Sequence, residues 1–340
     1  MSKKKLSILI STVLFYVLLI GSALTSCDNV IYDGLDPCPQ GVRLRFVYDY
    51  NMEFANSFHK KVDCVTLYVY DEKGNYLKTI TETTDVLANE NYRMTLDFEP
   101  GHYRLVAYGG LACEEHSFSV VNAPSRQTSV YTDLQVRMDD GELGTKLHDF
   151  YYGMQDVEIR ATDMDYVEET LYMMKNTNNI RIVLQQLSGD PVDDEDFSFF
   201  ITDDNTLFAH DNMLVPNGTV TYTPWVKGEA STGLIDTGNG LGEQEVIVAY
   251  AELSTSRLMT HTSPRLIIKR NDTGADIVNI PLNNYLLLLK SMVYDDMGSQ
   301  EFLDRESDWS MIFFLDTKHA WINTHIIIND WIVRFNDTDF

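Results

Sequence analysis

The stretch VRLRFVY occupies residues Val42–Tyr48 and alternates between two kinds of side chain. Every second residue, beginning with Val42, is apolar or aromatic, whereas Arg43 and Arg45 fall on the opposite face of an extended chain. This period of two predicts a β-strand that is buried on one face. The same alternation recurs along the chain, so the stretch indicates the fold class of the whole protein.

Further runs of this kind follow at short intervals, and clusters of Gly, Pro, Asn and Asp separate them. Asp71–Asn75, for example, is rich in turn residues and predicts a hairpin between two of the runs. Short strands at close spacing predict an all-β fold of antiparallel sandwiches. The strands expected in the first half are Val42–Tyr48, Val62–Tyr70, Tyr76–Ile80, Tyr92–Phe98 and Tyr103–Tyr108.

The second half repeats this pattern with two short helical turns, expected at Tyr285–Lys290 and Gln300–Arg305. Its expected strands are Ile180–Leu184, Phe197–Ile201, Thr219–Trp225, Glu245–Leu253, Arg265–Lys269, Ala275–Pro281, Met311–Asp316 and Thr324–Phe335.

The alternation weakens between roughly residues 114 and 170. Asp139–Gly141, Gly144 and Tyr151–Gly153 indicate loops in this part of the chain. We place the domain boundary near Glu169–Asn179, where Lys175–Asn179 is a polar interruption before the next expected strand. Two tandem domains are therefore expected, at residues 42–172 and 173–340.

Three lysines, Lys3, Lys4 and Lys5, precede an apolar run from Leu6 to Leu24. The run ends in Leu24-Thr25-Ser26-Cys27, which resembles the lipobox of signal peptidase II substrates. This order predicts a lipoprotein signal peptide at residues 1–26 and acyl chains, such as palmitate, on Cys27. A retained membrane-spanning helix and an ordinary secretory signal are the alternatives. An acidic, proline-containing tether is expected at residues 27–41.

Composition limits the class of partner. The chain has 340 residues, of which 44% are hydrophobic and 11% aromatic, enough for packed cores in two domains. Its net charge of −25 repels nucleic acid and anionic lipid headgroups alike, which excludes a nucleic-acid function. Membrane attachment is therefore expected through acyl chains.

Four cysteines are present. If Cys27 carries lipid, one disulfide is expected among Cys38, Cys64 and Cys113, and the sequence leaves the pair open. The chain has no C-x-x-C, so we predict no zinc site.

No arrangement of residues favours catalysis. Adjacent acids do not face each other across a cleft as glycosidase carboxylates do, so we interpret them as solvated loop charges. They are Asp139-Asp140, Asp193-Asp194, Asp203-Asp204 and Asp295-Asp296. Calcium at Asp193–Asp196 is the less favoured interpretation, because the spacing of a known calcium loop is missing.

Two His-Asp pairs and a glycine-rich stretch also lack the rest of a catalytic motif. His148-Asp149 and His210-Asp211 have no accompanying nucleophile elbow and are expected in turns. Gly238–Gly242 lacks the lysine of a phosphate-binding loop and indicates a hairpin connection. We therefore predict no enzyme activity, no cofactor and no metal site.

Five stretches carry a resemblance to a known family: Cys38–Phe46, Val62–Asp71, Pro100–Gly110, Lys175–Leu184 and Asp330–Arg334. Together they are similar to the FimB-like fimbrial anchor subunits of the type V pili of Bacteroides-type bacteria, over most of the mature chain. The resemblance implies two transthyretin-like, Greek-key β-sandwich domains and no enzymatic activity. It also implies a place in the outer membrane at the base of a fimbrium (pilus), on the cell surface.

These observations favour a lipid-anchored fimbrial subunit that seats the shaft on the outer membrane and limits its length. A strand added to an open sheet edge or groove would join it to a shaft subunit. Which strand is donated and which shaft protein is bound stay open. The alternative is a surface glycan-binding lipoprotein, which needs an exposed aromatic platform. Tyr68 and Tyr70 could stack on sugar rings or pack against a second sheet.

Overall fold

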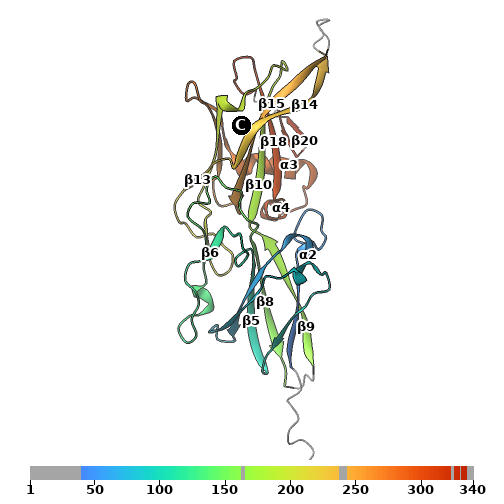
Figure 1. The fold of residues 1–340 in the computed structure, drawn as a ribbon, viewed down its shortest axis with the longest axis vertical. Coiled ribbons are helices and arrows are strands. Elements are labelled where there is room, and N and C mark those ends of the chain that lie inside the picture. The colour runs from blue at the N-terminus through green and yellow to red at the C-terminus, as the bar shows by residue number, and fades with distance from the viewer. Residues whose placement is uncertain (1–39, 162–164, 237–242, 323–324, 330, 335–340) are drawn as a thin grey trace, which may run out of the picture. The chain divides into compact units, whose positions relative to one another are not determined.

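The computed structural model describes residues 40–161, 165–236, 243–322, 325–329 and 331–334. Figure 1 draws these residues in colour. They form sheets of seven, six, four and three strands, and few helices, which confirms the all-β fold class. No helix within these ranges combines the length and the apolar character that a bilayer crossing needs. The expected signal peptide, the lipobox Leu24–Cys27 and Cys38 lie outside the described residues.

The seven-stranded sheet has the order β3-β2-β5-β8-β9-β1-β4. It divides into two layers because β8 and β9 share only three residue pairs. The layer β3-β2-β5-β8 packs against the layer β9-β1-β4, and one apolar core that includes Leu44, Leu67 and Leu171 lies between them. The strands are β1 (Gly41–Val47), β2 (Val65–Asp71), β3 (Tyr76–Glu82), β4 (Met94–Asp97), β5 (Gly101–Gly109), β8 (Tyr151–Ile159) and β9 (Tyr166–Lys175). The short helical elements are α2 (Phe58–Lys61) and η1 (Asp85–Ala88).

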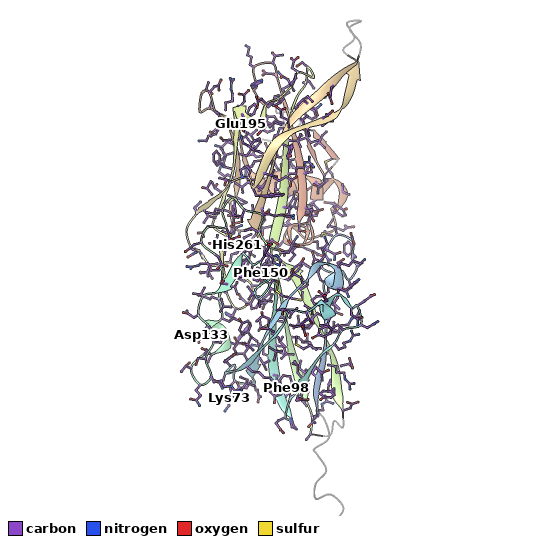
Figure 2. All side chains as sticks on the ribbon, viewed as in Figure 1. Lys73, Phe98, Asp133, Phe150, Glu195 and His261 are labelled. Carbon is purple, nitrogen blue, oxygen red and sulfur yellow. A yellow bond between two sulfur atoms is a disulfide. The ribbon has the colours of Figure 1, made fainter. Side chains whose placement is uncertain are left out.

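The outer face of β2, β5 and β8 is covered by residues 111–150, which include β6 (Phe118–Val120), η2 (Tyr131–Asp133) and β7 (Val136–Met138). Tyr68 and Tyr70 point into this second core and are 7% and 0% exposed. Their packing against a second layer is therefore confirmed. Figure 2 labels Phe150, whose fully buried ring belongs to the same cluster.

The prediction of a loop at Tyr151–Gly153 is wrong, because these residues begin the inner strand β8 (Tyr151–Ile159). A Cβ atom at Gly153 would lie 2.4 Å from both Leu171 Cδ2 and Tyr172 O. Glycine is needed at this position because β9 approaches β8 closely. In the sequence alone, the same glycine indicates a turn.

In the second half, the sheet β14-β15-β10-β18-β19-β20 packs on the sheet β13-β11-β16-β17. Their strands are β10 (Thr177–Gln186), β11 (Phe197–Asp203), β13 (Val220–Tyr222), β14 (Val226–Asp236), β15 (Glu243–Ser256), β16 (Arg265–Arg270), β17 (Asp276–Pro281), β18 (Asp308–Leu315), β19 (His325–Ile328) and β20 (Trp331–Arg334). The helices are η3 (Asp194–Asp196), α3 (Leu282–Val293) and α4 (Ser299–Arg305). A two-residue strand, β12 (Leu207–Phe208), pairs with β7 in the three-stranded sheet.

Three further features of the fold differ from expectation. The single strand expected at Thr324–Phe335 is a hairpin of β19 and β20, with Asn329 at a positive φ of 45° between them. The polar interruption at Lys175–Asn179 is a single residue, Asn176, between β9 and β10. Two ladders are parallel rather than antiparallel, β1 with β9 and β10 with β18.

Candidate functional site

The strand β1 follows the expected tether and is built into the middle of a layer. It pairs in parallel with β9 over seven residues, from Gly41 opposite Tyr166 to Val47 opposite Tyr172. On its other side it pairs antiparallel with β4. Every second side chain enters the core: Val42 and Leu44 are 0% exposed and Phe46 is 3% exposed. The predicted half-buried strand is confirmed.

Glycine is required where the chain enters β1. Gly41 has a φ of 152°, and a Cβ atom there would lie 1.9 Å from Leu96 O. The preceding residue is fixed as well, because Phe98 N donates a hydrogen bond to Gln40 O (3.1 Å). Backbone contacts therefore define the point at which the tether joins the folded body.

Most sheet edges in the described part of the chain are short or interrupted. The edge strands β4 and β20 have four residues each. The edge strand β3 carries Lys78 and a register shift, and Tyr76 N donates to Ser129 O in a covering loop. Lysines, bulges and short strands are common protections against unwanted strand pairing.

The edge strand β14 is the longest of the described edge strands, with eleven residues, and among the described strands it pairs with β15 alone. It also carries Lys227 and a register shift between Ser231 and Leu234, so its length rather than a lack of protection distinguishes it from β3. Figure 1 shows β14 and β15 running out together as a ribbon. The strand β10 pairs with β15 only from Ala249 to Ser256, so residues 243–248 pair only with β14. One further bond, from Val192 N to Ile247 O, reaches this part of β15. A two-stranded ribbon with open edges is marginal in water, and a partner strand would stabilise it.

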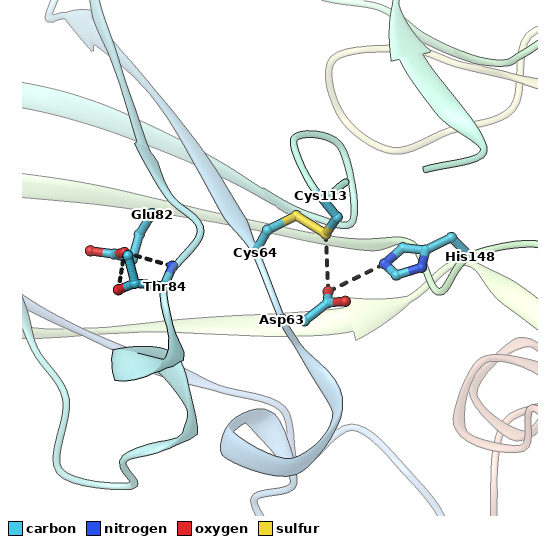
Figure 3. The surroundings of a disulfide bond; sticks show 6 residues. All are labelled: Asp63, Cys64, Glu82, Thr84, Cys113 and His148. Atoms are coloured by element: carbon cyan, nitrogen blue, oxygen red, sulfur yellow. Dashed lines mark hydrogen bonds and ion pairs between the residues drawn. A yellow bond between two sulfur atoms is a disulfide. The ribbon is translucent and has the colours of Figure 1, made fainter. Parts of the chain in front are cut away.

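The disulfide joins Cys64 and Cys113, whose Cα atoms are 5.3 Å apart (Figure 3). It fixes the covering segment 111–150 to the start of β2. Asp63 Oδ1 lies 3.0 Å from Cys113 Sγ and 3.2 Å from His148 Nε2. Figure 3 also shows Glu82 accepting hydrogen bonds from the N and Oγ1 atoms of Thr84.

The two His-Asp pairs do not form dyads between neighbours. His148 contacts Asp63, whereas Asp149 Oδ1 lies 2.9 Å from Lys175 Nζ. The ring of His210 packs edge-on against Tyr131 at 4.5 Å. His210-Asp211 lies in a turn, as predicted, but His148-Asp149 lies in an irregular segment. The glycine-rich stretch 238–242 lies outside the described residues.

The residues Lys175–Asn178, here called the joint, connect the two large sheets and are all buried. The side-chain amides of Asn176 and Asn212 exchange two hydrogen bonds, of 2.7 and 3.0 Å. Asn176 N donates to Phe150 O (2.7 Å), and Asn178 Nδ2 donates to Ser256 O (3.2 Å). The joint therefore has partners from both halves of the chain.

A buried ion pair lies close to the joint. Arg257 donates two hydrogen bonds to the carboxylate of Asp304, at 2.7 and 2.8 Å, and a third to Asn212 O at 2.9 Å. Both side chains are less than a tenth exposed. The two partners are far apart in the sequence, and no local pattern indicates their pairing.

Three of the four acidic pairs lie at or near the surface. In the fourth pair, Asp203-Asp204, the side chain of Asp203 is buried. Asp203 ends β11 and is 4% exposed, so its interpretation as a solvated loop charge is wrong. Asp204 N and Thr262 Oγ1 donate to its carboxylate. Burial removes water from this carboxylate and raises its pKa to about 6, although both hydrogen bonds oppose the rise.

This raised pKa predicts a pH-dependent stability. The folded chain keeps the Asp203 proton up to about pH 6, whereas an unfolded chain releases it near pH 4. The free energy of unfolding should therefore fall as the pH rises through this window. Asp203→Asn should remove that fall and raise the free energy of unfolding at pH 7.5 by about 1–2 kcal/mol. Urea titrations at pH 4 and pH 7.5 measure both effects, with the exposed Asp140→Asn as control. If the free energy of unfolding depended on pH in the same way for the Asp203→Asn and wild-type chains, the predicted effect of Asp203 would be contradicted.

Carboxylates of Asp193, Asp194 and Glu229 come within 4.8 Å of one another. The ammonium of Lys227 lies 3.5 Å from Asp194 and 3.2 Å from Glu195. This cation supplies positive charge to the acidic cluster, and it ties η3 to the edge strand β14.

Comparisons with known proteins extend over the described body. A profile of the fimbrillin-A associated anchor proteins Mfa1 and Mfa2 matches residues 35–337. The chain is 21% identical over 178 residues to the minor fimbrium anchoring subunit Mfa2 of Porphyromonas gingivalis, a match that covers 50% of this chain and 54% of that protein. The matched region thus spans about half the length of this curated relative.

Two solved structures from Bacteroides thetaiotaomicron are similar over most of their length. One, described as a candidate adhesin, is 57% identical, with a TM-score of 0.83 and coverage of 89% of this chain and 100% of that one. The other, described as a candidate polysaccharide-binding protein, is 28% identical, with a TM-score of 0.74 and coverage of 88% and 99%.

Proposed function

This chain belongs to the family of the fimbrillin-A associated anchor proteins Mfa1 and Mfa2, and we propose that it is a lipid-anchored subunit that holds a fimbrial shaft on the outer membrane. The family match from residue 35 to residue 337 carries the proposal, because it includes every described strand. In this proposal residues 42–172 and 173–340 are two transthyretin-like domains, and the protein binds other chains rather than catalysing a reaction.

The proposed membrane link is Cys27. Removal of residues 1–26 would make it the first residue, and acyl chains on it would enter the outer membrane. The charge of −25 supports this route, since the acidic surface is repelled by anionic headgroups and needs a hydrophobic anchor. The residues 27–41 would then hold the body near the membrane, with β1 as the first fixed element.

The proposed contact with the shaft is a strand added to β14. It is the longest edge strand among the described strands, with six consecutive ladder residues from Val226 to Ser231 before a register shift, and its ribbon with β15 would gain a third strand. A subunit fixed to the membrane at its N-terminus carries no further shaft subunit beneath it. Such a subunit would end the polymer and limit its length.

A pull-down tests this proposal. When the lipoprotein is solubilised from outer membranes and captured, a polymerised shaft subunit should be recovered with it. Glu229→Pro and Ala230→Pro provide matched variants, because neighbouring residues of an edge strand direct their N–H groups alternately inward and outward. The variant that loses an outward N–H should fold normally and recover less shaft. If native lipoprotein brings down no shaft subunit, the proposed attachment is refuted.

One comparison favours a second candidate function, the binding of a surface glycan. The 28% identical structure is described as a candidate polysaccharide-binding protein. Against this function, Tyr68 and Tyr70 are buried and offer no platform for a sugar ring. Trp225 is partly exposed, with Lys146 Nζ 5.4 Å from its ring centroid. Oligosaccharide binding that Trp225→Ala abolishes, together with a pull-down that lacks shaft, would favour the glycan function.

A further inference from the structure

The pairing of β1 with β9 determines how the fold responds to tension on the tether. Tension enters β1 at its first residue, Gly41, and pulls against the direction in which the strand runs. Because β9 is parallel to β1, tension toward β10 leaves β9 at its other end, at Lys175. The two strands are then pulled in opposite directions along their common axis. Their ladder of seven pairs is loaded in shear, and its bonds must break together.

Side-chain packing resists the same sliding movement. The side chains of Val42, Leu44 and Phe46 are inserted in the core between the two layers. The ring of Phe46 stacks on Phe58 at 5.4 Å. Movement of β1 along its axis would drag all three from the core at once. Shear therefore works against both the ladder and the apolar packing.

The strand β9 passes this tension on without an intervening loop. Only Asn176 separates it from β10, which lies between β15 and the parallel strand β18. The amide pair of Asn176 with Asn212 and the ion pair of Lys175 with Asp149 hold the joint. Tension can therefore pass from the first sheet to an inner strand of the second sheet along one continuous stretch of backbone.

We infer that β1, β9 and β10 form a load-bearing line, which carries tension from the N-terminal tether into the second half of the protein. This inference rests on the proposed function, which places the membrane attachment at the N-terminus. The ladder of β1 and β9 bypasses residues 48–165, and the described part of this segment, residues 48–161 and 165, keeps its fold while the ladder holds.

The disulfide lies inside this bypassed segment and limits its extension. If the ladder failed, residues 48–165 could stretch by roughly 410 Å at about 3.5 Å per residue. Cys64 and Cys113 are separated by 49 positions, and their bond withholds that span, or roughly 170 Å. The same bond that fixes the covering segment would thus shorten the extension after a rupture.

Optical tweezers test the load-bearing line on residues 28–340, which leave out the proposed lipid-bearing Cys27, with one handle at each end. The hairpin of β19 and β20 is pulled from its free end and should peel pair by pair at low force. Release of β1 should need a higher force and lengthen the oxidised chain by roughly 240 Å. After reduction of the disulfide, the gain in chain length on release of β1 should increase by roughly a further 170 Å.

Two leucines provide matched variants, since Leu44 in β1 and Leu266 in β16 are both 0% exposed. Leu44→Ala should lower the force that releases β1, whereas Leu266→Ala should leave it unchanged. If Leu44→Ala and Leu266→Ala lowered the force that releases β1 by the same amount, the inference of a load-bearing line would be refuted. Release of β1 in the wild-type chain at the force of hairpin peeling would also refute it, a result that stands even if Leu44→Ala fails to fold. These readings involve no shaft and no membrane, so they fail or hold separately from the pull-down.

Discussion

Cells that carry the Cys27→Ala chain should release most of their fimbriae into the culture medium. Acyl chains contribute about 0.8 kcal/mol for each buried CH₂ group, and the acidic body has no other strong attraction to an anionic membrane. The variant would keep its contact with the shaft but lose its hold on the outer membrane. Immunoblots of shaft subunit in washed cells and in medium measure the distribution.

The matched control is Cys38→Ala, which removes a nearby cysteine and leaves the lipobox Leu24–Cys27 unchanged. Fimbriae should stay on those cells. Fimbriae that remain firmly attached in the Cys27→Ala strain would contradict the proposed anchoring role of this residue.

Asp304→Ala should give the largest loss of stability that the structure predicts for a single substitution. It would leave Arg257 buried and charged without its carboxylate partner. Breaking one side of such a pair costs about 3–5 kcal/mol, and Tm should fall by roughly 10 °C. Thermal unfolding followed by circular dichroism measures the change.

Two controls separate burial from pairing. Arg104 and Asp156 form an exposed pair of similar geometry, so Asp156→Ala should cost less than about 1 kcal/mol. The double variant Arg257→Met with Asp304→Leu should be more stable than Asp304→Ala, since it leaves no unpaired charge. A fall in Tm for Asp304→Ala no larger than that for Asp156→Ala would contradict the structural role of the buried pair.

The strands could be predicted from the sequence wherever one face of the strand is buried and the other face is exposed to solvent. Val42–Tyr48 shows this clearly, because its arginines and core residues alternate. The expected hairpin of β2 and β3 is confirmed for the same reason, with turn residues between the strands. The family resemblance is confirmed as well, because the family match covers residues 35–337 and includes all five stretches that carry the resemblance.

Other elements could not be predicted from the alternation of apolar and polar residues. Residues 111–150 contribute buried side chains such as Phe118 and Phe150 singly, from short strands and irregular segments, so they show no regular period. Gly153 resembles a turn residue in the sequence, but close strand packing explains it. The β19–β20 hairpin was missed because apolar residues occur in both strands of one short run.

The joint and the disulfide depend on distant parts of the chain. Asn176 and Asn212 are 36 positions apart and form hydrogen bonds only in the folded chain, and neither residue has a local signal in the sequence. Likewise, Cys64 could be paired with Cys113 only from the distance between them in the fold. The location of Cys27 next to small residues is a local signal, and for that reason the sequence alone supports its proposed role.

Mass spectrometry of the N-terminal peptide of the native protein tests the proposed lipid anchor on Cys27 without the need for any variant. We expect the mature chain to begin at Cys27, residues 1–26 to be absent, and this cysteine to carry at least two acyl chains. A peptide that begins at Met1, or a Cys27 without any acyl group, would contradict it.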